Sequence, residues 1–307
     1  MNKKYIADFT LLFVAFVWGT TFVVVQNAIS FLQPHTFNAV RFFMAALLLS
    51  VWLVVFRRDE IKAINKKLLL SGMAIGFWLF IGYACQTIGL VYTTSSKAGF
   101  ITGLSVVLVP LLSFFILKIK PGIYAIIGVC IATVGLYLLT MTGTAVLNIG
   151  DLLVFFCAIG FAMQIIYTGK YSSQYPSLSL TIIQISFVAI LSSVCAFLFE
   201  DWQKAIQPEI LFQREVVIAL MVTSFLATAF AFLVQTYFQK YTSATHTALI
   251  FATEPVFAAL TAFLFAGERM SVGGIIGSIF ILLGMIFAEF PSKRKKAAEN
   301  TIQEKAV

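Results

Sequence analysis

Long runs of apolar residues, separated by short polar segments, make up almost the whole chain. A helix that crosses a hydrocarbon core of ~30 Å needs about 20 mostly apolar residues, and its backbone groups must bond within the helix. Ten runs have about this length, and Pro, Gly, Asn or charged residues lie between them. The pattern therefore predicts ten transmembrane helices, at 9–29, 36–56, 68–90, 98–117, 122–140, 152–168, 178–199, 216–238, 245–265 and 272–290.

The composition agrees with a membrane protein. Apolar residues make up 60% of the chain, charged residues 11%, and the mean hydropathy is +0.97. A soluble domain carries about a quarter charged residues, and a surface with far fewer would expose large apolar patches to water. The net charge of +8 comes from cations between apolar runs, with no basic stripe among exposed aromatic residues, so we expect no nucleic-acid partner.

The distribution of Lys and Arg predicts the orientation of the helices. When the N-terminus is placed inside, sixteen of these residues fall on inner segments and four on outer segments, with Arg41 within a span. Short cytoplasmic loops of membrane proteins carry an excess of Lys and Arg. We therefore expect a multi-pass protein of the cell membrane with both termini in the cytoplasm.

The chain contains an internal repeat. A shift of 149 residues superimposes polar residues and glycines of the first half on the second, and a shift of 143 places Asp8 over Asp151. Each half holds five spans, an odd number, so the second copy enters the membrane from the opposite side. Such inverted repeats are common in secondary transporters, with the substrate site near the midplane between the halves. The matched pairs are Gln86/Gln235, Thr87/Thr236, Tyr92/Tyr241, Thr93/Thr242, Gly128/Gly277 and Gly135/Gly284.

Several short motifs, and their order along the chain, resemble those of the ten-helix EamA-type transporters of the drug/metabolite transporter superfamily. The resemblance covers roughly residues 8–290 and implies an all-α membrane fold of two inverted five-helix repeats. It divides the chain into one EamA-like repeat at 8–140, a second at 150–290 and a basic cytoplasmic tail at 291–307. The residues that carry it are Trp18-Gly19-Thr20-Thr21-Phe22, Arg41-Phe42, Glu254-Pro255, Gly267-Glu268-Arg269, Gly277 and Gly284.

Uncharged polar and aromatic side chains within the spans are the candidates for substrate binding. A binding site needs oriented donors and acceptors within mostly apolar walls. By resemblance, the first, fourth and sixth spans line a central cavity. Hydrogen bonding between helices is the alternative role for any one of them. The substrate-binding candidates are Trp18, Thr20, Thr21, Tyr83, Gln86, Thr102, Gln164, Tyr167 and Gln235, with Ser105 as a further polar residue of the fourth span.

Glu254 is the candidate for proton coupling. It lies near the middle of the ninth span, whereas Asp8 and Asp151 lie near span ends, within reach of water. Ionisable residues inside a membrane are functional candidates by default, and a carboxyl group removed from water favours its neutral form. The alternative role is structural, because Pro255 disturbs the helix and a protonated Glu254 can bond to the freed backbone.

Three cationic or titratable residues lie closer to span ends. We interpret Arg41 as reaching toward the lipid headgroups, with pairing to an anionic substrate as the alternative. Lys97 and His246 occupy matching repeat positions and are interpreted as interfacial residues. A proton-carrying role for His246 is the alternative.

The sequence thus predicts a secondary transporter that moves small metabolites across the cytoplasmic membrane by alternating access. By resemblance it exports amino acids or similar compounds. The expected partners are a small-molecule substrate and membrane lipid, the protein being a monomer or a dimer, and no cofactor is expected. An intramembrane enzyme lacks its motifs here, including a His-Glu-x-x-His zinc pair. That class, or a membrane sensor or scaffold without transport, remains the alternative.

Overall fold

The computed structural model describes residues 3–93, 95–118, 120–140, 148–265 and 271–289, and within them the chain is helical and contains no β-strand. The first half contains α1 (Lys3–Ala28), α2 (Pro34–Phe56), α3 (Arg58–Lys62), α4 (Lys66–Tyr92), α5 (Ser95–Gly103), α6 (Ser105–Leu117) and α7 (Ile123–Thr140). The second half contains α8 (Ile149–Tyr171), α9 (Ser177–Phe199), η1 (Trp202–Ile206), α10 (Pro208–Leu211), α11 (Arg214–Met221), η2 (Val222–Phe230), α12 (Ala231–Phe238), η3 (Gln239–Tyr241), α13 (Ala244–Phe251), α14 (Glu254–Phe265) and α15 (Val272–Glu289).

Each of the ten predicted spans corresponds to helical structure. Within the described ranges, seven helical runs are long and apolar enough to cross a membrane, and Ile123–Leu138 and Val272–Ala288 are shorter apolar helices. The remaining predicted span, 245–265, consists of α13 followed by α14. The all-α membrane fold class is therefore confirmed. The seven runs are Tyr5–Ala28, Pro34–Phe56, Lys66–Tyr92, Ala98–Leu117, Ile149–Tyr171, Ser177–Phe199 and Arg214–Tyr241.

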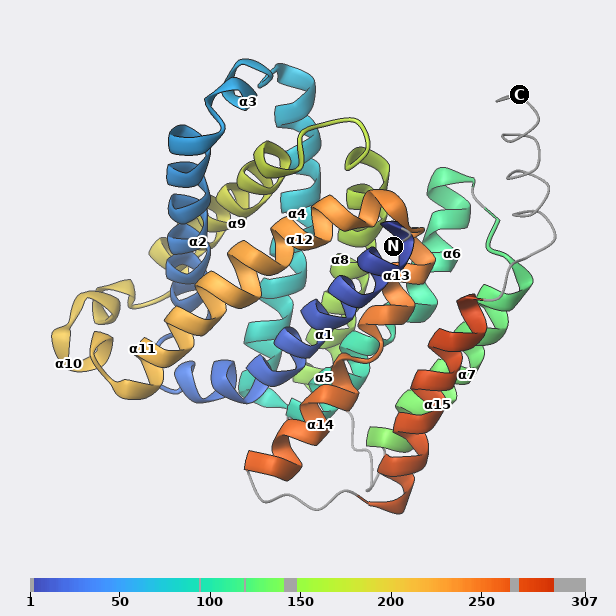
Figure 1. Cartoon of the computed structure of the whole chain (residues 1–307). Helices are drawn as coiled ribbons and strands as arrows, with labels where there is room; N and C mark the ends of the chain where they lie inside the picture. The colour runs from blue at the N-terminus through green and yellow to red at the C-terminus, as the bar shows by residue number, and fades with distance from the viewer. Residues whose placement is uncertain (1–2, 94, 119, 141–147, 266–270, 290–307) are drawn as a thin grey trace.

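The helix packing follows the inverted repeat. Two pairs join equivalent spans of the two halves, because α2 packs along α9 and α7 packs along α15 (Figure 1). Another kind of contact occurs twice, with the two halves exchanged. The third span (α4) packs on the sixth (α8), and their repeat counterparts, the eighth span (α12) and the first (α1), pack on each other. The two halves therefore interlock, and the space between them is bounded by both.

Glycines allow the closest of these contacts. A Cβ atom added to Gly128 in α7 would lie 2.5 Å from the carbonyl oxygen of Gly284 in α15, and one added to Gly284 would lie 2.5 Å from the carbonyl oxygen of Gly128. A Cβ atom on Gly135 would lie 2.6 Å from the oxygen of Gly277. Small residues let two membrane helices approach to backbone contact. The matched glycines of the repeat therefore hold its two copies together.

The fourth and ninth spans are interrupted, whereas the sequence indicated a disturbance at Pro255 in the ninth span alone. α5 ends at Gly103 and α6 begins at Ser105, while α13 ends at Phe251 and α14 begins at Glu254. The 149-residue shift places Ser105 opposite Glu254, so the two interruptions are equivalent. α5 and α13 each contact both α1 and α8, whereas α6 packs on α8 and α14 packs on α1 (Figure 1).

The eighth span contains a second irregularity. Between α11 and α12 the segment η2 has π-helical hydrogen bonding over nine residues. Its repeat counterpart, α4, is an uninterrupted α-helix. Because π-helical turns inside α-helices frequently occur at functional sites, the backbone of η2 becomes relevant to the cavity beside it.

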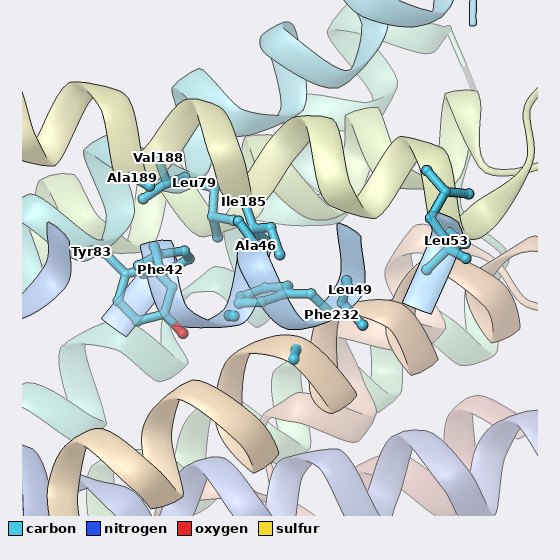
Figure 2. Packing of buried hydrophobic residues seen from close by; sticks show 13 residues of the cluster. Phe42, Ala46, Leu49, Leu53, Leu79, Tyr83, Ile185, Val188, Ala189 and Phe232 are labelled. Atoms are coloured by element: carbon cyan, nitrogen blue, oxygen red, sulfur yellow. The ribbon is translucent and has the colours of Figure 1, made fainter. Parts of the chain in front are cut away.

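An aromatic cluster packs where α2, α4, α9 and α12 meet. Phe42, Tyr83 and Phe232 lie close together in Figure 2, with ring centroids of Phe42 and Tyr83 4.9 Å apart in an edge-to-face arrangement. Their neighbours on α9 include Ile185 and Val188. This packing fixes the ring of Tyr83 at the boundary between the core and the central cavity.

Candidate functional site

A cavity lies between the two halves of the protein. Its walls come from α1, α2, α4, α5, α6, α8, α12, α13 and α14. Of the nine predicted substrate-binding residues and the proton-coupling candidate Glu254, seven line it: Trp18, Thr21, Tyr83, Gln86, Thr102, Gln164 and Glu254. Arg41, Ser105, Phe161, Phe232, Phe251 and Pro255 also line it, and the remaining lining residues are mostly apolar or Gly. Mostly apolar walls with a few convergent polar groups are typical of small-molecule sites.

The cavity extends toward one face of the membrane. Val25 and Leu90, in the last turns of α1 and α4, are among its lining residues. Both helices end at the face opposite the N-terminus, because each begins on the N-terminal side of the bilayer. No residue of the first four turns of α1 lines the cavity. The described conformation therefore places the cavity nearer the face that does not carry the N-terminus.

The side of the cavity formed by α4, α5 and α8 carries uncharged polar groups. Gln86 donates through Nε2 to Oγ1 of Thr102 over 3.4 Å, a long bond. The same hydroxyl lies 3.7 Å from Sγ of the buried Cys157. Gln86 is only partly buried, so its amide is available to a molecule in the cavity.

Arg41 is buried at the cavity rather than exposed at the headgroups. Only 3% of its surface is accessible, and Nε donates to Oγ1 of Thr228 over 2.7 Å. The centre of its guanidinium lies 4.6 Å from the ring centroid of Tyr83. The interpretation of Arg41 as a residue that reaches toward the lipid is therefore wrong. The hydrophobic pattern gives the depth of a residue in its span, but not the side of the helix on which it lies.

The π-helical segment η2 supplies acceptors to two cavity residues. The indole Nε1 of Trp18 donates to the carbonyl oxygen of Ala227 over 2.8 Å. Nη2 of Arg41 approaches the same oxygen at 3.4 Å, and Thr228 accepts from Nε of Arg41. A side chain on α1 and another on α2 are thus oriented by one irregular turn of the eighth span.

Glu254 begins α14 directly after the interruption of the ninth span. It is partly buried and lines the cavity, as does the following Pro255. Thr253, which precedes it, is fully buried and donates through Oγ1 to the carbonyl oxygen of Ile250 over 2.6 Å. Gly19 of α1 packs against the backbone here, since a Cβ atom on Gly19 would lie 2.5 Å from the carbonyl oxygen of Glu254. The carboxyl group is therefore held at the cavity by a tightly packed turn.

A network of glutamines lies beside the cavity on the N-terminal side. Gln164 and Gln235 exchange hydrogen bonds of 3.1 and 3.3 Å between their side-chain amides. Gln235 also donates to Oε1 of Gln239 over 3.2 Å, and Gln239 donates to the carbonyl oxygen of Ile165 over 2.6 Å. All three glutamines are at most 2% exposed. The network joins α8 to α12 and η3.

Three predicted substrate-binding residues do not line the cavity. Gln235 lies in the glutamine network, although its repeat counterpart Gln86 faces the cavity. Thr20 donates through Oγ1 to the carbonyl oxygen of Val17 within α1. Tyr167 packs between the apolar clusters of α8 and its neighbours, with Lys170 over its ring.

Phe161 and Phe232 are cavity residues that the sequence analysis did not select. Phe232 occupies the position that matches Tyr83 at the shift of 149 residues. The repeat therefore contained the signal for Phe232. Phe161 has no such signal, because an aromatic residue in an apolar helix looks the same whether it faces lipid or the cavity.

Two acidic residues near span ends are held by other elements. Oδ1 of Asp8 lies 3.1 Å from Nε2 of His246, which is 8% exposed. Asp151 is 3% exposed, caps the start of α8 with Asn148, and accepts from Oγ1 of Thr93 over 2.6 Å. The expectation that water surrounds Asp151 is therefore wrong. The side chain of Lys97, the repeat counterpart of His246, lies outside what the structure describes.

Metal ligands do not gather within the described ranges. No group of three or more His, Cys, Asp or Glu side chains there is placed to hold a metal ion. The polar side-chain groups of the described cavity lining are amides, hydroxyls, the indole N–H of Trp18, one guanidinium and one carboxyl group.

Comparison with known proteins identifies relatives over nearly the whole chain. The sequence model of the EamA-like transporter family matches residues 5–141 and again residues 148–290. A protein of Archaeoglobus fulgidus named "Uncharacterized transporter" is 36% identical over 92% of this chain and 86% of its own length. YoaV of Bacillus subtilis, also named an uncharacterized transporter, is 23% identical over 92% of this chain and 96% of its own length.

A solved crystal structure has the same fold. It aligns with a TM-score of 0.76 over 95% of this chain and 99% of its own, at 17% sequence identity. At that identity the likeness concerns the fold alone. The arrangement of the helices therefore has an experimental precedent.

Proposed function

Because the chain belongs to the EamA-like transporter family and is thus a membrane transporter, we propose that it is a secondary transporter working by alternating access. Its cargo is small metabolites such as amino acids, which it exports across the cytoplasmic membrane. The observation that supports this proposal is the cavity, whose walls come from both halves of the inverted repeat. Such repeats typically place the substrate site at their interface.

Alternating access requires a site that opens to one face at a time. The cavity extends toward the face opposite the N-terminus, while the glutamine network joins α8 to α12 on the N-terminal side. We assign this network as the gate on that side. Its amides can exchange hydrogen bonds with each other for hydrogen bonds with water, so opening need not leave buried polar groups unsatisfied.

We assign substrate contacts to the cavity residues Trp18, Thr21, Tyr83, Gln86, Thr102 and Gln164. They combine aromatic surface with amide and hydroxyl groups. Thr20, Tyr167 and Gln235 lie outside the cavity in the described conformation. They would meet substrate only in a state where α1, α8 and α12 have moved.

We also assign proton coupling to Glu254. Among the described acidic residues it is the one that lines the cavity. A carboxyl group favours its neutral form when sealed from water and its ionised form when the cavity is hydrated. Protonation would thereby be linked to the conformational equilibrium.

The proposed organisation comprises two five-helix repeats at 8–140 and 150–290 and a cytoplasmic tail at 291–307, which lies outside the described residues. Both termini are placed in the cytoplasm on the basis of the Lys and Arg distribution. A single cysteine at Thr144, in a protein without its four native cysteines, should react with an impermeant reagent from outside intact cells. Protection of this cysteine until the cells are opened would reverse the orientation.

The decisive test of transport starts from cells with and without the protein. We expect metabolite profiling of the medium to show compounds that accumulate only when the protein is present. Purified protein in vesicles should then move those compounds down an imposed gradient. Absence of flux, combined with chemical conversion of a metabolite, would favour an intramembrane enzyme. Absence of both would favour a sensor or scaffold.

A further inference from the structure

Arg41 is a buried cation that lacks an anionic partner in the described parts of the protein. Its hydrogen bonds go to neutral acceptors: Oγ1 of Thr228 at 2.7 Å, the hydroxyl of Tyr83 at 3.3 Å and the carbonyl of Ala227 at 3.4 Å. Across the described ranges, the ion pairs involve other residues, and Glu254 forms none with Arg41. The bonds use Nε and Nη2, and Nη1 takes part in none of them.

Such a group is costly without a counter-ion. Removing a cation from water costs several kcal/mol even after the protein relaxes, and neutral hydrogen bonds recover only part of this. The rings of Tyr83 and Phe42, with centroids 4.6 and 5.4 Å from the guanidinium carbon, contribute further stabilisation. Figure 2 shows these two rings packed against each other and near Phe232. The aromatic cluster fixes the position of Arg41, which forms no ion pair within the described ranges.

The position of Arg41 indicates what supplies the missing charge. Its side chain lines the central cavity, so an anion in the cavity can reach the guanidinium directly. A carboxylate can accept from the unused Nη1 and, by replacing one of the long bonds of Nη2, bind the planar fork of Arg41 bidentately. One guanidinium balances one negative charge, whereas a phosphate monoester carries −1.5 to −2 near pH 7. The described cavity lining contains no second cation.

We propose that Arg41 binds the carboxylate of a small organic substrate whose apolar part lies against the aromatic wall formed by Trp18, Phe161 and Phe232. The inference rests on the proposed transport function and deepens it, because it specifies the chemical group that the cavity recognises. Thr228 and the Ala227 carbonyl of η2 act as positioning groups, which orient the fork of Arg41 toward the cavity.

Binding tests this inference more directly than flux, since neutral forms of many carboxylic acids cross lipid unaided. The full-length protein in detergent is titrated with acetate, butanoate, hexanoate, benzoate and phenylacetate, and with the amide of each. Dissociation constants are obtained from the rise of Tm with ligand concentration. We expect at least one carboxylate to bind wild-type protein at least tenfold more tightly than its amide.

Two variants and a control test whether Arg41 causes the preference for a carboxylate over its amide. Arg41→Gln should reduce the carboxylate-to-amide ratio to within about twofold of unity, and Arg41→Lys should retain part of it, because a point charge lacks the fork. Arg58→Gln removes an exposed Arg on α3 that donates to the carbonyl of Val54, and it should keep the wild-type ratio. The comparison of carboxylates with amides in wild-type protein stands even if Arg41→Gln does not fold.

Each possible result either supports or overturns the inference. Equal binding of every carboxylate and its amide to wild-type protein would overturn it, as would an unchanged preference in Arg41→Gln. Carboxylate binding through Arg41, without flux of any compound in vesicles, would support the inference while overturning the proposed transport. Flux of neutral solutes that Arg41→Gln leaves unaltered would support transport and overturn the role of Arg41.

Discussion

The fourth and ninth spans have the same interruption but carry different chemistry. α5 gives way to α6 at Leu104, and α13 gives way to α14 at the equivalent position, Thr253. The first residue after the interruption is Ser105 in one span and Glu254 in the other, and both line the cavity. The backbone geometry is therefore common to both repeats, whereas the ionisable group belongs to one.

The two spans share the interruption of the helix but not the ionisable side chain that follows it. An interruption places the start of a half-helix beside the cavity, and discontinuous helices are a recurring way to form transporter sites near the midplane. The inverted repeat provides two such positions. Only the ninth span uses its position for a group that can bind and release a proton, so the two halves should respond differently to substitutions at matched positions.

The largest expected effect is on proton coupling. Glu254→Gln keeps the size and polarity of the side chain but removes its titration, so flux should lose its dependence on a pH gradient. Substrate exchange at equal pH should remain largely intact. The measurement is the ratio of flux with and without a pH gradient, in vesicles loaded with a compound identified by metabolite profiling.

Ser105→Ala is the matched control for this substitution. It alters the equivalent position of the fourth span and should keep the pH-gradient ratio of wild-type protein, whatever its effect on the rate. A Glu254→Gln variant that retains the ratio would mean that Glu254 is not the sole coupling site. A variant that loses exchange together with thermal stability would favour the structural role of the carboxyl group.

The second prediction concerns the packing that holds the ninth span. Gly19→Ala would place a Cβ atom 2.5 Å from the carbonyl oxygen of Glu254 and 2.9 Å from Cβ of Phe257. Backbone cannot yield cheaply, so overpacking should destabilise the protein by about 1–3 kcal/mol. The measurement is the Tm of purified protein in detergent, which should fall.

Gly99→Ala in α5 is the control within the fourth span. A Cβ atom there would meet no atom within 4 Å, so the Tm should stay close to that of wild-type protein. Equal losses of Tm in the two variants would contradict the view that close packing distinguishes the turn at Glu254.

The smallest expected effect concerns the hydroxyl of Thr253. Thr253→Val removes the bond to the carbonyl of Ile250, at a buried position. We expect a loss of about 0.5–1.5 kcal/mol, read as a modest decrease in Tm. Thr261→Val removes a similar bond, to the carbonyl of Phe257, from a partly buried residue within α14. If Thr261→Val lowers the Tm as much as Thr253→Val, the bond at the interruption contributes no more to stability than a similar bond within α14.

The hydrophobic pattern was sufficient to place the spans. Lipid imposes a minimum apolar length on a helix, so span positions follow from composition along the chain. Pro255 indicated a disturbance of the ninth span, but the interruptions at Leu104 and Thr253 could not be located from apolar length, because a few polar or small residues around them do not shorten the apolar run. The π-helical segment Val222–Phe230 gave no signal for the same reason.

The candidate site was only partly accessible from the sequence. Polar type and depth selected Gln86 and Thr102, which line the cavity. They also selected Gln235, whose surroundings differ from those of Gln86 although the repeat relates the two. The rotation of a helix about its axis, together with neighbours such as Gln164 and Gln239, decides whether a side chain faces the cavity. A strongly apolar helix carries little periodicity from which this rotation can be deduced. Arg41 was misinterpreted because two of its acceptors, Thr228 and Ala227, lie on the eighth span, far away in the sequence.

The segment η2 has a mechanical consequence. A π-helical turn accommodates an additional residue relative to an α-helical turn, because its bonds run from i to i+5. Conversion of η2 to α-helical bonding would rotate α12 by about 100° relative to α11 and displace it by about 1.5 Å along the axis. That rotation would carry Phe232 away from the cavity wall and Gln235 away from Gln164. Such a conversion would change the register of the eighth span, whereas the regular α4 contains no π-helical turn to convert.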